Sequence, residues 1–337
     1  MKGQYELEPT QGSPTIYSQV VSGSGVEVVH NYLAENLSNY TLNTLSPKLG
    51  ALPCLIPSYK GNSDIIHTTA ELGTRGFTAS GKNLLSIHNY YYDERYLSSV
   101  RDIKRRLYYK HIARGANVAA CKKADHIVTV SNFLADIIKQ EINPKTEISV
   151  IHNGIDTQRF TKKKKNHEKP RILFAGNPIA RKGFDIFKAV ATALSHKADF
   201  WATGGLQNHK QAHSDHIRFI PKVPYSEMPT IFQESDILLF PSHREGFGLV
   251  VAEAMACGQA VVCSNNSALP ELIDSDLGGL LVNSHEYKDW VKAVETLIDS
   301  SHLRQEFGNY NRHKAEQCFG LEKMLTEYQL VFQSLKF

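Results

Sequence analysis

The sequence predicts an α/β protein of two domains, each built on a parallel sheet. Apolar strand-like runs alternate with helical patterns through almost all of the 337 residues, which is typical of parallel sheets with helical crossovers. The length suits two domains of ordinary size. The stretch 158–170, which includes the run TKKKKNHEKP, is charged and lacks hydrophobic periodicity. It is therefore the predicted linker between the two domains.

The first domain is expected to span residues 1–157. Residues 1–13 are polar, so Thr15–Val21 is the only apolar run available for a first strand. Short runs rich in apolar and β-branched residues predict further strands at Tyr40–Leu45, Ile65–Thr68, Asn83–His88, His126–Val130 and Ile148–Ile151. Helical spacing predicts helices at Val26–Asn36, Val100–Ala120 and Ser131–Lys139.

The same pattern restarts after the linker and predicts a second domain at 171–320. Its strands are expected at Arg171–Ala175, Ala198–Thr203, Ile217–Ile220, Ile237–Phe240, Ala260–Cys263 and Gly279–Val282. Its helices are expected at Gly183–Leu194, Ser226–Gln233, Leu249–Ala256, Leu269–Ile273 and Tyr287–Ser300. The amphipathic tail at 321–337 predicts one more helix, which either caps the second domain or packs back towards the first.

The composition is that of a folded globular protein. Hydrophobic residues make up 42% and charged residues 21% of the chain. We find no apolar run long enough to span a membrane and no secretory signal at the N-terminus, so the expected location is cytoplasmic. The five cysteines form no C-x-x-C pair, which argues against a disulfide framework or a zinc site.

The segment FPSHREGFGLVVAEAMACG, from residue 240 to 258, is the most informative in the chain. It predicts a strand that ends at Phe240, a glycine-rich loop and a helix from Leu249. Glycines allow a ligand to approach the backbone closely, and a helix N-terminus favours negative charge. Glu245 and Glu253 could bind hydroxyl groups at two separate points. The alternative is a capped helix with two solvated glutamates, but the apolar neighbours of Glu253 disfavour it.

This segment resembles the E-x7-E motif of the retaining glycosyltransferases called GT4, or glycosyl transferases group 1. Other segments agree with the resemblance, which covers roughly residues 20–320: SGSG at 22–25, SIHN at 86–89, VSNF at 130–133, VIHNGID at 150–156 and ILFAGNPIARKGFD at 172–185. The resemblance implies the GT-B fold, in which two Rossmann-like α/β domains have parallel sheets that face an interdomain cleft. The first domain would bind the acceptor and the second the nucleotide-sugar donor.

The resemblance also implies roles for individual residues. Arg181 and Lys182 would contact the pyrophosphate of the donor, Glu253 the ribose, Glu245 the donor sugar, and His88 would lie beside that sugar. The implied catalytic residues are His88, Glu245, Arg181 and Lys182. The implied donor-binding residues are Gly23, Gly25, Arg181, Lys182, Val223, Glu245, Gly246, Phe247, Gly248, Leu249 and Glu253.

No metal or other cofactor is expected. Arg181 and Lys182 supply the positive charge that a departing diphosphate requires. The Asp274-Ser275-Asp276 triplet has the form of a metal-binding D-x-D, but it follows the helical PELID and precedes GGLL, so we interpret it as a surface turn. The segment GSGVEV begins like a dinucleotide fingerprint, but Val28 replaces the third glycine and no acidic residue closes the next strand. This argues against an NAD enzyme.

The segment 89–114 combines tyrosines with basic residues and predicts contact with an anionic membrane surface. The residues expected to bind there are Arg101, Lys104, Arg105, Arg106 and Lys110. Nucleic acid is a competing partner, but no nucleic-acid-binding motif accompanies the patch. A solvated helix face is the third possibility.

Together these expectations describe a retaining, metal-independent enzyme. It would transfer a hexose-type sugar from a UDP-sugar, or as second choice GDP-mannose, to a hydroxyl of a lipid-linked or saccharide acceptor. The expected setting is cell-envelope polysaccharide or lipopolysaccharide synthesis, at the cytoplasmic face of the inner membrane. Two alternatives stay open: a sugar-nucleotide epimerase of the same fold, and a non-catalytic module that binds a sugar nucleotide or a membrane.

Overall fold

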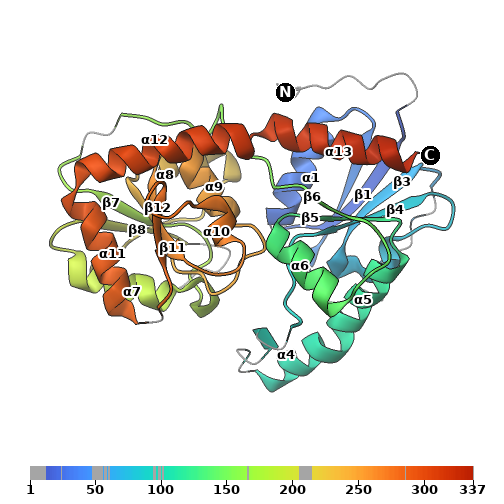
Figure 1. Cartoon of the computed structure of the whole chain (residues 1–337), viewed down its shortest axis with the longest axis horizontal. Coiled ribbons are helices and arrows are strands. Elements are labelled where there is room, and N and C mark those ends of the chain that lie inside the picture. Colours follow the sequence, from blue (N-terminus) through green and yellow to red (C-terminus); the bar gives the residue numbers. More distant parts are fainter. Residues whose placement is uncertain are drawn as a thin grey trace. The chain divides into compact units, whose positions relative to one another are not determined.

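The computed structural model divides the chain into two compact units (Figure 1). The first comprises Met1–Gly154 and Leu321–Phe337, and the second comprises Ile155–Gly320. The predicted linker, 158–170, falls inside the second unit, where Phe160 is fully buried. The C-terminal helix belongs to the first unit. The described residues are 13–23, 25–47, 56, 59, 61–93, 96–97, 100, 102–164, 167–204, 215–284 and 286–336.

The first unit contains a six-stranded sheet in the order β2-β1-β3-β4-β5-β6, and every neighbouring pair is parallel. Its strands are β1 (Ile16–Val21), β2 (Tyr40–Leu45), β3 (Ile65–Thr69), β4 (Lys82–Ile87), β5 (His126–Thr129) and β6 (Ile148–Val150). Its helices are α1 (Gly25–Asn36), η2 (Ala70–Gly76), α4 (Ile103–Leu107), the π-helical η3 (Tyr108–Ala113), α5 (Arg114–Lys123), α6 (Asn132–Glu141) and α13 (Leu321–Leu335).

The second unit contains a six-stranded parallel sheet in the order β12-β11-β10-β7-β8-β9. Its strands are β7 (Arg171–Phe174), β8 (Asp199–Thr203), β9 (Arg218–Ile220), β10 (Ile237–Phe240), β11 (Ala260–Ser264) and β12 (Gly279–Val282). Its helices are η4 (Ala180–Lys182), α7 (Phe184–Leu194), η5 (Tyr225–Glu227), α8 (Met228–Gln233), α9 (Leu249–Ala256), α10 (Leu269–Leu272), α11 (Tyr287–Asp299) and α12 (Ser301–Cys318).

These sheets confirm the predicted α/β class, and the predicted strands lie within one or two residues of the observed ones. The central strands are buried on both faces, as parallel strands covered by helices require. Strand β10 is an example, because all four of its residues are buried. That burial fixes the position of the loop that follows it.

Two longer helical regions differ from the prediction, and the short 3₁₀ helices η2 and η4 were not predicted. The single helix expected at 100–120 is divided by the π-helical turn η3. Helix α12 was not predicted, because it has no continuous apolar stripe. Phe307 is its one large buried side chain, and small and polar groups supply the rest of the packing. A Cβ on Gly308 would lie 2.2 Å from the Gly258 carbonyl oxygen, and the Asn311 amide donates to the carbonyls of Gln259 and Gly278 at 2.8 and 2.6 Å.

Gly183 connects η4 to α7 and offers a test of this packing. Its φ of +73° favours glycine, and a Cβ there would lie 2.0 Å from the Pro241 carbonyl oxygen. We expect Gly183→Ala to lower the free energy of unfolding by about 2–4 kcal/mol, from backbone strain and overpacking. Chemical denaturation measures this. Gly115→Ala is the control: in the described part of the chain a Cβ at this helical position meets no atom within 4 Å, so a gain of about 0.5–1 kcal/mol is expected. Equal stabilities for the two variants would contradict the packing argument.

Candidate functional site

The loop between β10 and α9 forms the centre of the candidate site. Gly248, with φ +106°, is the N-cap of α9 and makes no side-chain cap hydrogen bond. A Cβ on Gly248 would also lie 2.9 Å from the Leu269 side chain. The conformation and the close contact both require glycine here. Because glycine has no side chain, Gly248 cannot cap the first N–H groups of α9. A helix N-terminus of this kind favours an anion.

Lys182 and Glu245 lie side by side in the structure, although 63 positions separate them in the sequence. The Lys182 ammonium donates to Glu245 Oε1 at 2.5 Å, and the Ser242 hydroxyl donates to the same oxygen at 2.5 Å. The Glu245 N–H donates to Ser267 Oγ at 3.0 Å. Glu245 is only 7% exposed. Hydrogen bonds to its carboxylate and to its backbone N–H thus fix its position in the loop.

Arg181 is held against the same loop. Its guanidinium donates to the Arg244 carbonyl at 3.1 Å, and its own carbonyl accepts from the His243 N–H at 3.0 Å. Because Gly183 lies against Pro241, the segment 181–183 follows the loop closely. Two cations from the β7–α7 connection are therefore fixed beside the entrance to α9, as the recognition of a diphosphate requires.

Glu253 lies in the second turn of α9 and is 4% exposed. Its Oε1 accepts a hydrogen bond of 2.7 Å from the Tyr225 hydroxyl. Burial raises the pKa of Glu253 to about 8, and the Tyr225 hydroxyl opposes that rise. A carboxyl group in this state can both donate to and accept from a pair of sugar hydroxyls. Val223, two residues before Tyr225, is half-buried.

Tyr225→Phe provides a test of this contact. The resemblance implies that Glu253 holds the ribose of a nucleotide. On that expectation, loss of one hydrogen bond to this buried carboxyl should weaken nucleotide binding about three- to tenfold, with the fold unchanged because the ring remains. The pKa of Glu253 should rise further, since the hydroxyl favours the ionised form. Titration calorimetry with UDP between pH 6 and pH 9 measures both effects. Affinity and pH dependence identical to those of the unmodified protein would show that Tyr225 does not act through Glu253.

The predicted first-domain residues all belong to the first unit. Helix α1 begins at Gly25, and Gly23 has φ +86° with no atom within 4 Å of a Cβ in the described part of the chain. The Gly23 N–H donates to Glu27 Oε2 at 2.7 Å, so this N–H is already hydrogen-bonded to a carboxylate of the protein itself. His88 follows β4 and is buried, and its ring lies 5.8 Å from that of His30 on α1.

The structure shows a buried network behind His88 that we did not predict. The Tyr40 hydroxyl bonds to Nδ1 of His30 and of His67 at 2.7 and 2.8 Å, and His67 Nε2 bonds to Ser86 Oγ at 2.6 Å. Ser86 in turn lies 3.3 Å from the hydroxyl of Tyr328 on α13. Burial lowers the pKa of His67 to about 3 and that of His88 to about 4. His88 is therefore neutral at pH 7 and can accept a hydrogen bond.

Several residues of the candidate site were missed by sequence reasoning. Ser242 and Ser267 hold Glu245, and Tyr225 contacts Glu253. The spacing of Ser242 from Glu245, three residues apart in one loop, was a usable signal for Ser242. Ser267 and Tyr225 gave none, since only the fold brings them to the glutamates.

The Asp274-Ser275-Asp276 triplet forms a turn, as predicted. The Asp274 carboxylate accepts from Lys314 at 2.9 Å and from the Tyr310 hydroxyl. Asp276 has φ +62°, and its N–H donates to the Gly279 carbonyl. Among the residues that the structure describes, no three His, Cys, Asp or Glu side chains are grouped to hold a metal ion.

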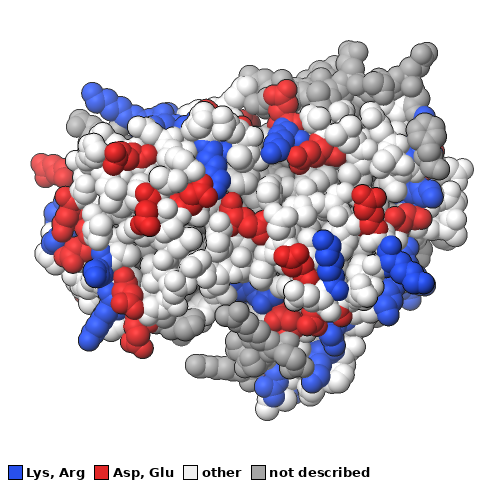
Figure 2. Space-filling view, in the orientation of Figure 1, with Lys and Arg blue, Asp and Glu red and all other residues white. Residues whose placement is uncertain are grey.

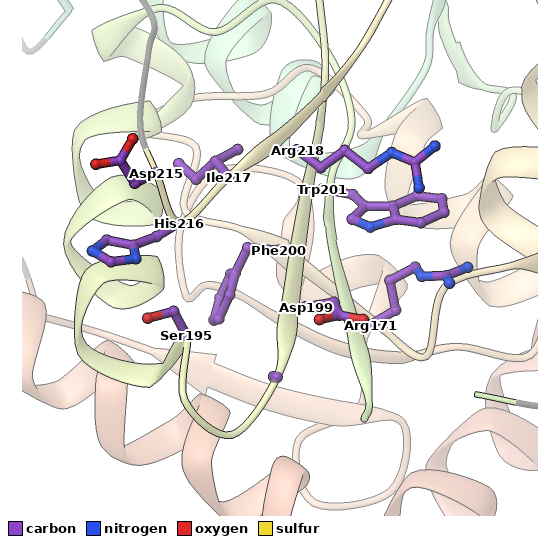
Figure 3. Close-up of a pocket in the computed structure, with 10 residues that line it drawn as sticks. Arg171, Ser195, Asp199, Phe200, Trp201, Asp215, His216, Ile217 and Arg218 are labelled. Carbon is purple, nitrogen blue, oxygen red and sulfur yellow. The ribbon is translucent and has the colours of Figure 1, made fainter. Parts of the chain in front are cut away.

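A separate cavity of about 460 Å³ lies at the opposite edge of the second sheet. Arg171, Asp199 and Arg218, the first residues of β7, β8 and β9, contribute to its lining. Trp201 lies between two guanidinium groups (Figure 3), with Arg171 at 3.6 Å and Arg218 at 4.7 Å from its ring centroid. Both faces of the indole are thus covered by the protein. The cavity is distinct from the loop that follows β10, which lies at the carboxyl ends of the strands.

Comparison with known proteins agrees with this arrangement. Residues 24–159 match the Glycosyltransferase Family 4 model, and residues 156–314 match the Glycosyl transferases group 1 model. The chain is 28% identical over 232 residues to the D-inositol 3-phosphate glycosyltransferase of Paenarthrobacter aurescens. That alignment covers 62% of this chain and 55% of the relative, so the chain matches about half the length of this relative.

Solved structures resemble the chain over nearly its whole length. Sucrose-phosphate synthase from Thermosynechococcus elongatus is similar with a TM-score of 0.77 at 17% identity, over 95% of this chain and 98% of that one. HepE from Anabaena, solved in complex with UDP-glucose, is similar with a TM-score of 0.73 at 16% identity, over 95% and 99%. The two adjoining family models and the two parallel α/β units identify the chain as a member of the glycosyl transferases group 1 family, of the family 4 type, with the GT-B fold.

Proposed function

We propose that this chain is a retaining glycosyltransferase that transfers a hexose-type sugar from a nucleotide diphosphate to a hydroxyl group. The observation that carries the proposal is the cluster of Lys182, Ser242 and Glu245 beside the N-terminus of α9. It combines a cation for the diphosphate with a fixed carboxylate for sugar hydroxyls. UDP-sugars are the favoured donors and GDP-mannose the second choice. The UDP-glucose complex of HepE, which has the same fold, supports UDP.

In this proposal the protein supplies charge and position rather than a nucleophile. Arg181 and Lys182 stabilise the negative charge that grows on the leaving diphosphate, so no metal ion is required. Glu253 holds the ribose, and the neutral His88 accepts a hydrogen bond from a hydroxyl of the donor sugar. No carboxylate is assigned as a covalent nucleophile. The acceptor attacks from the face that the diphosphate leaves, and a phosphate oxygen takes the acceptor proton.

The proposed acceptor is a lipid-linked or saccharide hydroxyl in cell-envelope polysaccharide or lipopolysaccharide synthesis. The basic, tyrosine-rich helix of the first unit supports a peripheral position at an anionic membrane surface, on the cytoplasmic side. Among the described residues, no helix is long and apolar enough to cross a membrane. Of the five cations predicted to bind the membrane, Lys104, Arg106 and Lys110 are exposed. Arg101 and the side chain of Arg105 lie outside the described part.

A transfer assay tests the reaction type. Donor sugar should be consumed only when an acceptor is present, and NMR of the product should show the same anomeric configuration as the donor. Consumption without an acceptor would favour an epimerase, and an inverted product would contradict the front-face mechanism. Loss of donor consumption in Glu245→Ala would exclude a non-catalytic module.

A further inference from the structure

A cluster of buried, uncharged polar side chains lies beside His88 in the first unit. Its members come from strands and helices that are far apart in the sequence: Ser18 on β1, His30 on α1, Tyr40 on β2, His67 on β3, Ser86 on β4 and Tyr328 on α13. Helix α13 packs against α1 (Figure 1). Buried polar groups lower stability unless they are hydrogen-bonded, and a fully bonded network holds its members in one arrangement.

The histidine rings of this region are neutral at pH 7. Burial lowers the pKa of His30, His67 and His88, and neighbouring histidines lower those of His30 and His67 further. Figure 2 shows Lys, Arg, Asp and Glu side chains scattered over the surface, whereas the hydrogen bonds of the cluster join only hydroxyl groups and imidazole rings. Each neutral ring has one N–H donor and one acceptor nitrogen.

The hydroxyl of Tyr40 connects two of the rings. It lies 2.7 Å from His30 Nδ1 and 2.8 Å from His67 Nδ1. Its single proton can be donated to only one of them. In the described part of the chain, His30 Nε2 is buried and has no hydrogen-bond partner. A buried N–H without an acceptor is less favourable than a buried lone pair without a donor, so the proton of His30 is on Nδ1, where Tyr40 and Ser18 Oγ are both within reach.

This assignment fixes the direction of the other hydrogen bonds. His30 Nδ1–H donates to the Tyr40 oxygen, and the Tyr40 hydroxyl donates to His67 Nδ1. His67 then has its proton on Nε2 and donates to Ser86 Oγ at 2.6 Å. The Ser86 hydroxyl donates to the Tyr328 oxygen, 3.3 Å away on α13. Each donor in this series has an acceptor, and His30 and His67 are opposite tautomers.

The ring of His88 packs against this series. Its centroid lies 5.8 Å from that of His30, which lies 4.5 Å from that of His67. Rings in a close-packed interior cannot rotate independently. We propose that Tyr40 is a positioning residue for His88: its shared hydroxyl fixes the rings of His30 and His67, and these fix the orientation of His88. The inference rests on the proposed function, in which His88 accepts a hydrogen bond from the donor sugar.

Histidine NMR on the full chain, labelled with nitrogen-15 histidine, tests the cluster without a substrate. At pH 7 the unmodified protein should show His30 protonated on Nδ1, His67 protonated on Nε2 and one set of ring signals for His88. Tyr40→Phe keeps the aromatic ring but removes the shared hydroxyl. The His88 signals should then split or broaden, because His30 can flip. The same tautomer in His30 and His67, or unchanged His88 signals in Tyr40→Phe, would overturn the proposal.

The matched control is Tyr17→Phe, which removes one hydroxyl from the strand next to β2. Tyr17 precedes Ser18 in β1, so its side chain points to the opposite face of the sheet from the cluster. This variant should leave the three histidine rings and the rate of sugar transfer unchanged. Signals of His88 that change equally in both variants would show that the shared hydroxyl has no special role.

A double-mutant cycle tests whether Tyr40 acts through His88. Tyr40→Phe should lower kcat for sugar transfer about tenfold, as misplacement of a group at the reacting centre does. The KM for the donor and the thermal shift with UDP should stay unchanged, because Arg181, Lys182 and Glu253, which are proposed to hold the nucleotide, belong to the second unit. In a His88→Ala background, Tyr40→Phe should lower kcat less than about twofold.

Equal losses in the two backgrounds would mean that Tyr40 only supports the fold, and would overturn the proposal. The cycle allows for any general destabilisation, since that effect persists without His88. If the unmodified protein transfers no sugar, the proposed function fails, and the NMR experiment still decides whether Tyr40 orients the His88 ring. The two failures are therefore distinguishable.

Discussion

Lys182→Ala is expected to lower kcat/KM for sugar transfer by about 100- to 1,000-fold. The ammonium lies 2.5 Å from the carboxylate of Glu245, in the loop between β10 and α9. A preorganised cation beside a leaving diphosphate acts mainly in the transition state, and removal of such a group typically has an effect of this size. Steady-state kinetics with the donor identified by binding measures it. A loss below about fivefold would exclude Lys182 from the chemistry.

Two further variants separate the catalytic effect from a structural one. Lys188→Ala removes an exposed lysine six residues later, on α7, and should leave kcat/KM unchanged. Lys182→Ala also leaves the buried Glu245 without its cation, which costs stability. Adding Glu245→Gln to Lys182→Ala should therefore recover part of the lost unfolding free energy but none of the activity. Recovered activity in the double variant would mean that Lys182 only neutralises Glu245.

Acid should destabilise the first unit steeply. His67 and His88 have pKa values lowered by burial to about 3 and about 4, and burial with the neighbouring His67 and His88 holds the pKa of His30 well below its ordinary value. Between pH 6.5 and pH 4 the unfolded chain therefore binds more protons than the folded one. The free energy of unfolding therefore keeps its full value above pH 6.5 and falls as the pH drops below 6.5. Each histidine lowers the free energy of unfolding by about 1.4 kcal/mol for each pH unit below 6.5, and the three together lower it by about 4 kcal/mol per pH unit.

Chemical denaturation at pH 7.5 and at pH 5.0 measures this loss. His67→Gln keeps hydrogen-bonding capacity without a titrating ring, so its loss of unfolding free energy over this range should be smaller than that of the unmodified protein by about 2 kcal/mol. His88→Asn should behave similarly. His302→Gln, at a side chain that is 82% exposed, is the control and should leave the loss unchanged. Equal losses in all four proteins would show that the histidines are not buried and neutral as described.

The sequence predicted the fold through its strands more reliably than through its helices. Strands such as β10 are continuous apolar runs between turns, so their limits can be read directly. Helix α12 could not be found in this way, because Gly308 and Asn311 bury it through close backbone contact and side-chain hydrogen bonds rather than through an apolar stripe. The π-helical turn was likewise invisible, since one extra residue in a turn leaves no compositional mark.

The candidate site was predictable where its residues are local in the chain. Glu245, Gly248 and Glu253 lie in one motif, and the structure places them at one strand–loop–helix junction. Contacts between distant segments, such as Ser267 with Glu245 and Tyr225 with Glu253, depend on how β10 and its neighbours bring separate loops together. The buried network around Tyr40 is also of this kind. Its histidines come from α1, β3 and the end of β4, and nothing in the spacing of these residues connects them.

The most direct test of the central claim is a thermal-shift panel of UDP, GDP, ADP and their common sugar conjugates, without added metal. A ligand at 100 times its dissociation constant stabilises the folded protein by about 2.7 kcal/mol, which is a readable shift. The proposal predicts a clear shift with UDP or a UDP-sugar, or failing that with GDP-mannose, and its loss in Arg181→Ala. If no nucleotide shifts the transition, the loop between β10 and α9 does not bind a diphosphate, and a non-catalytic role becomes the better explanation.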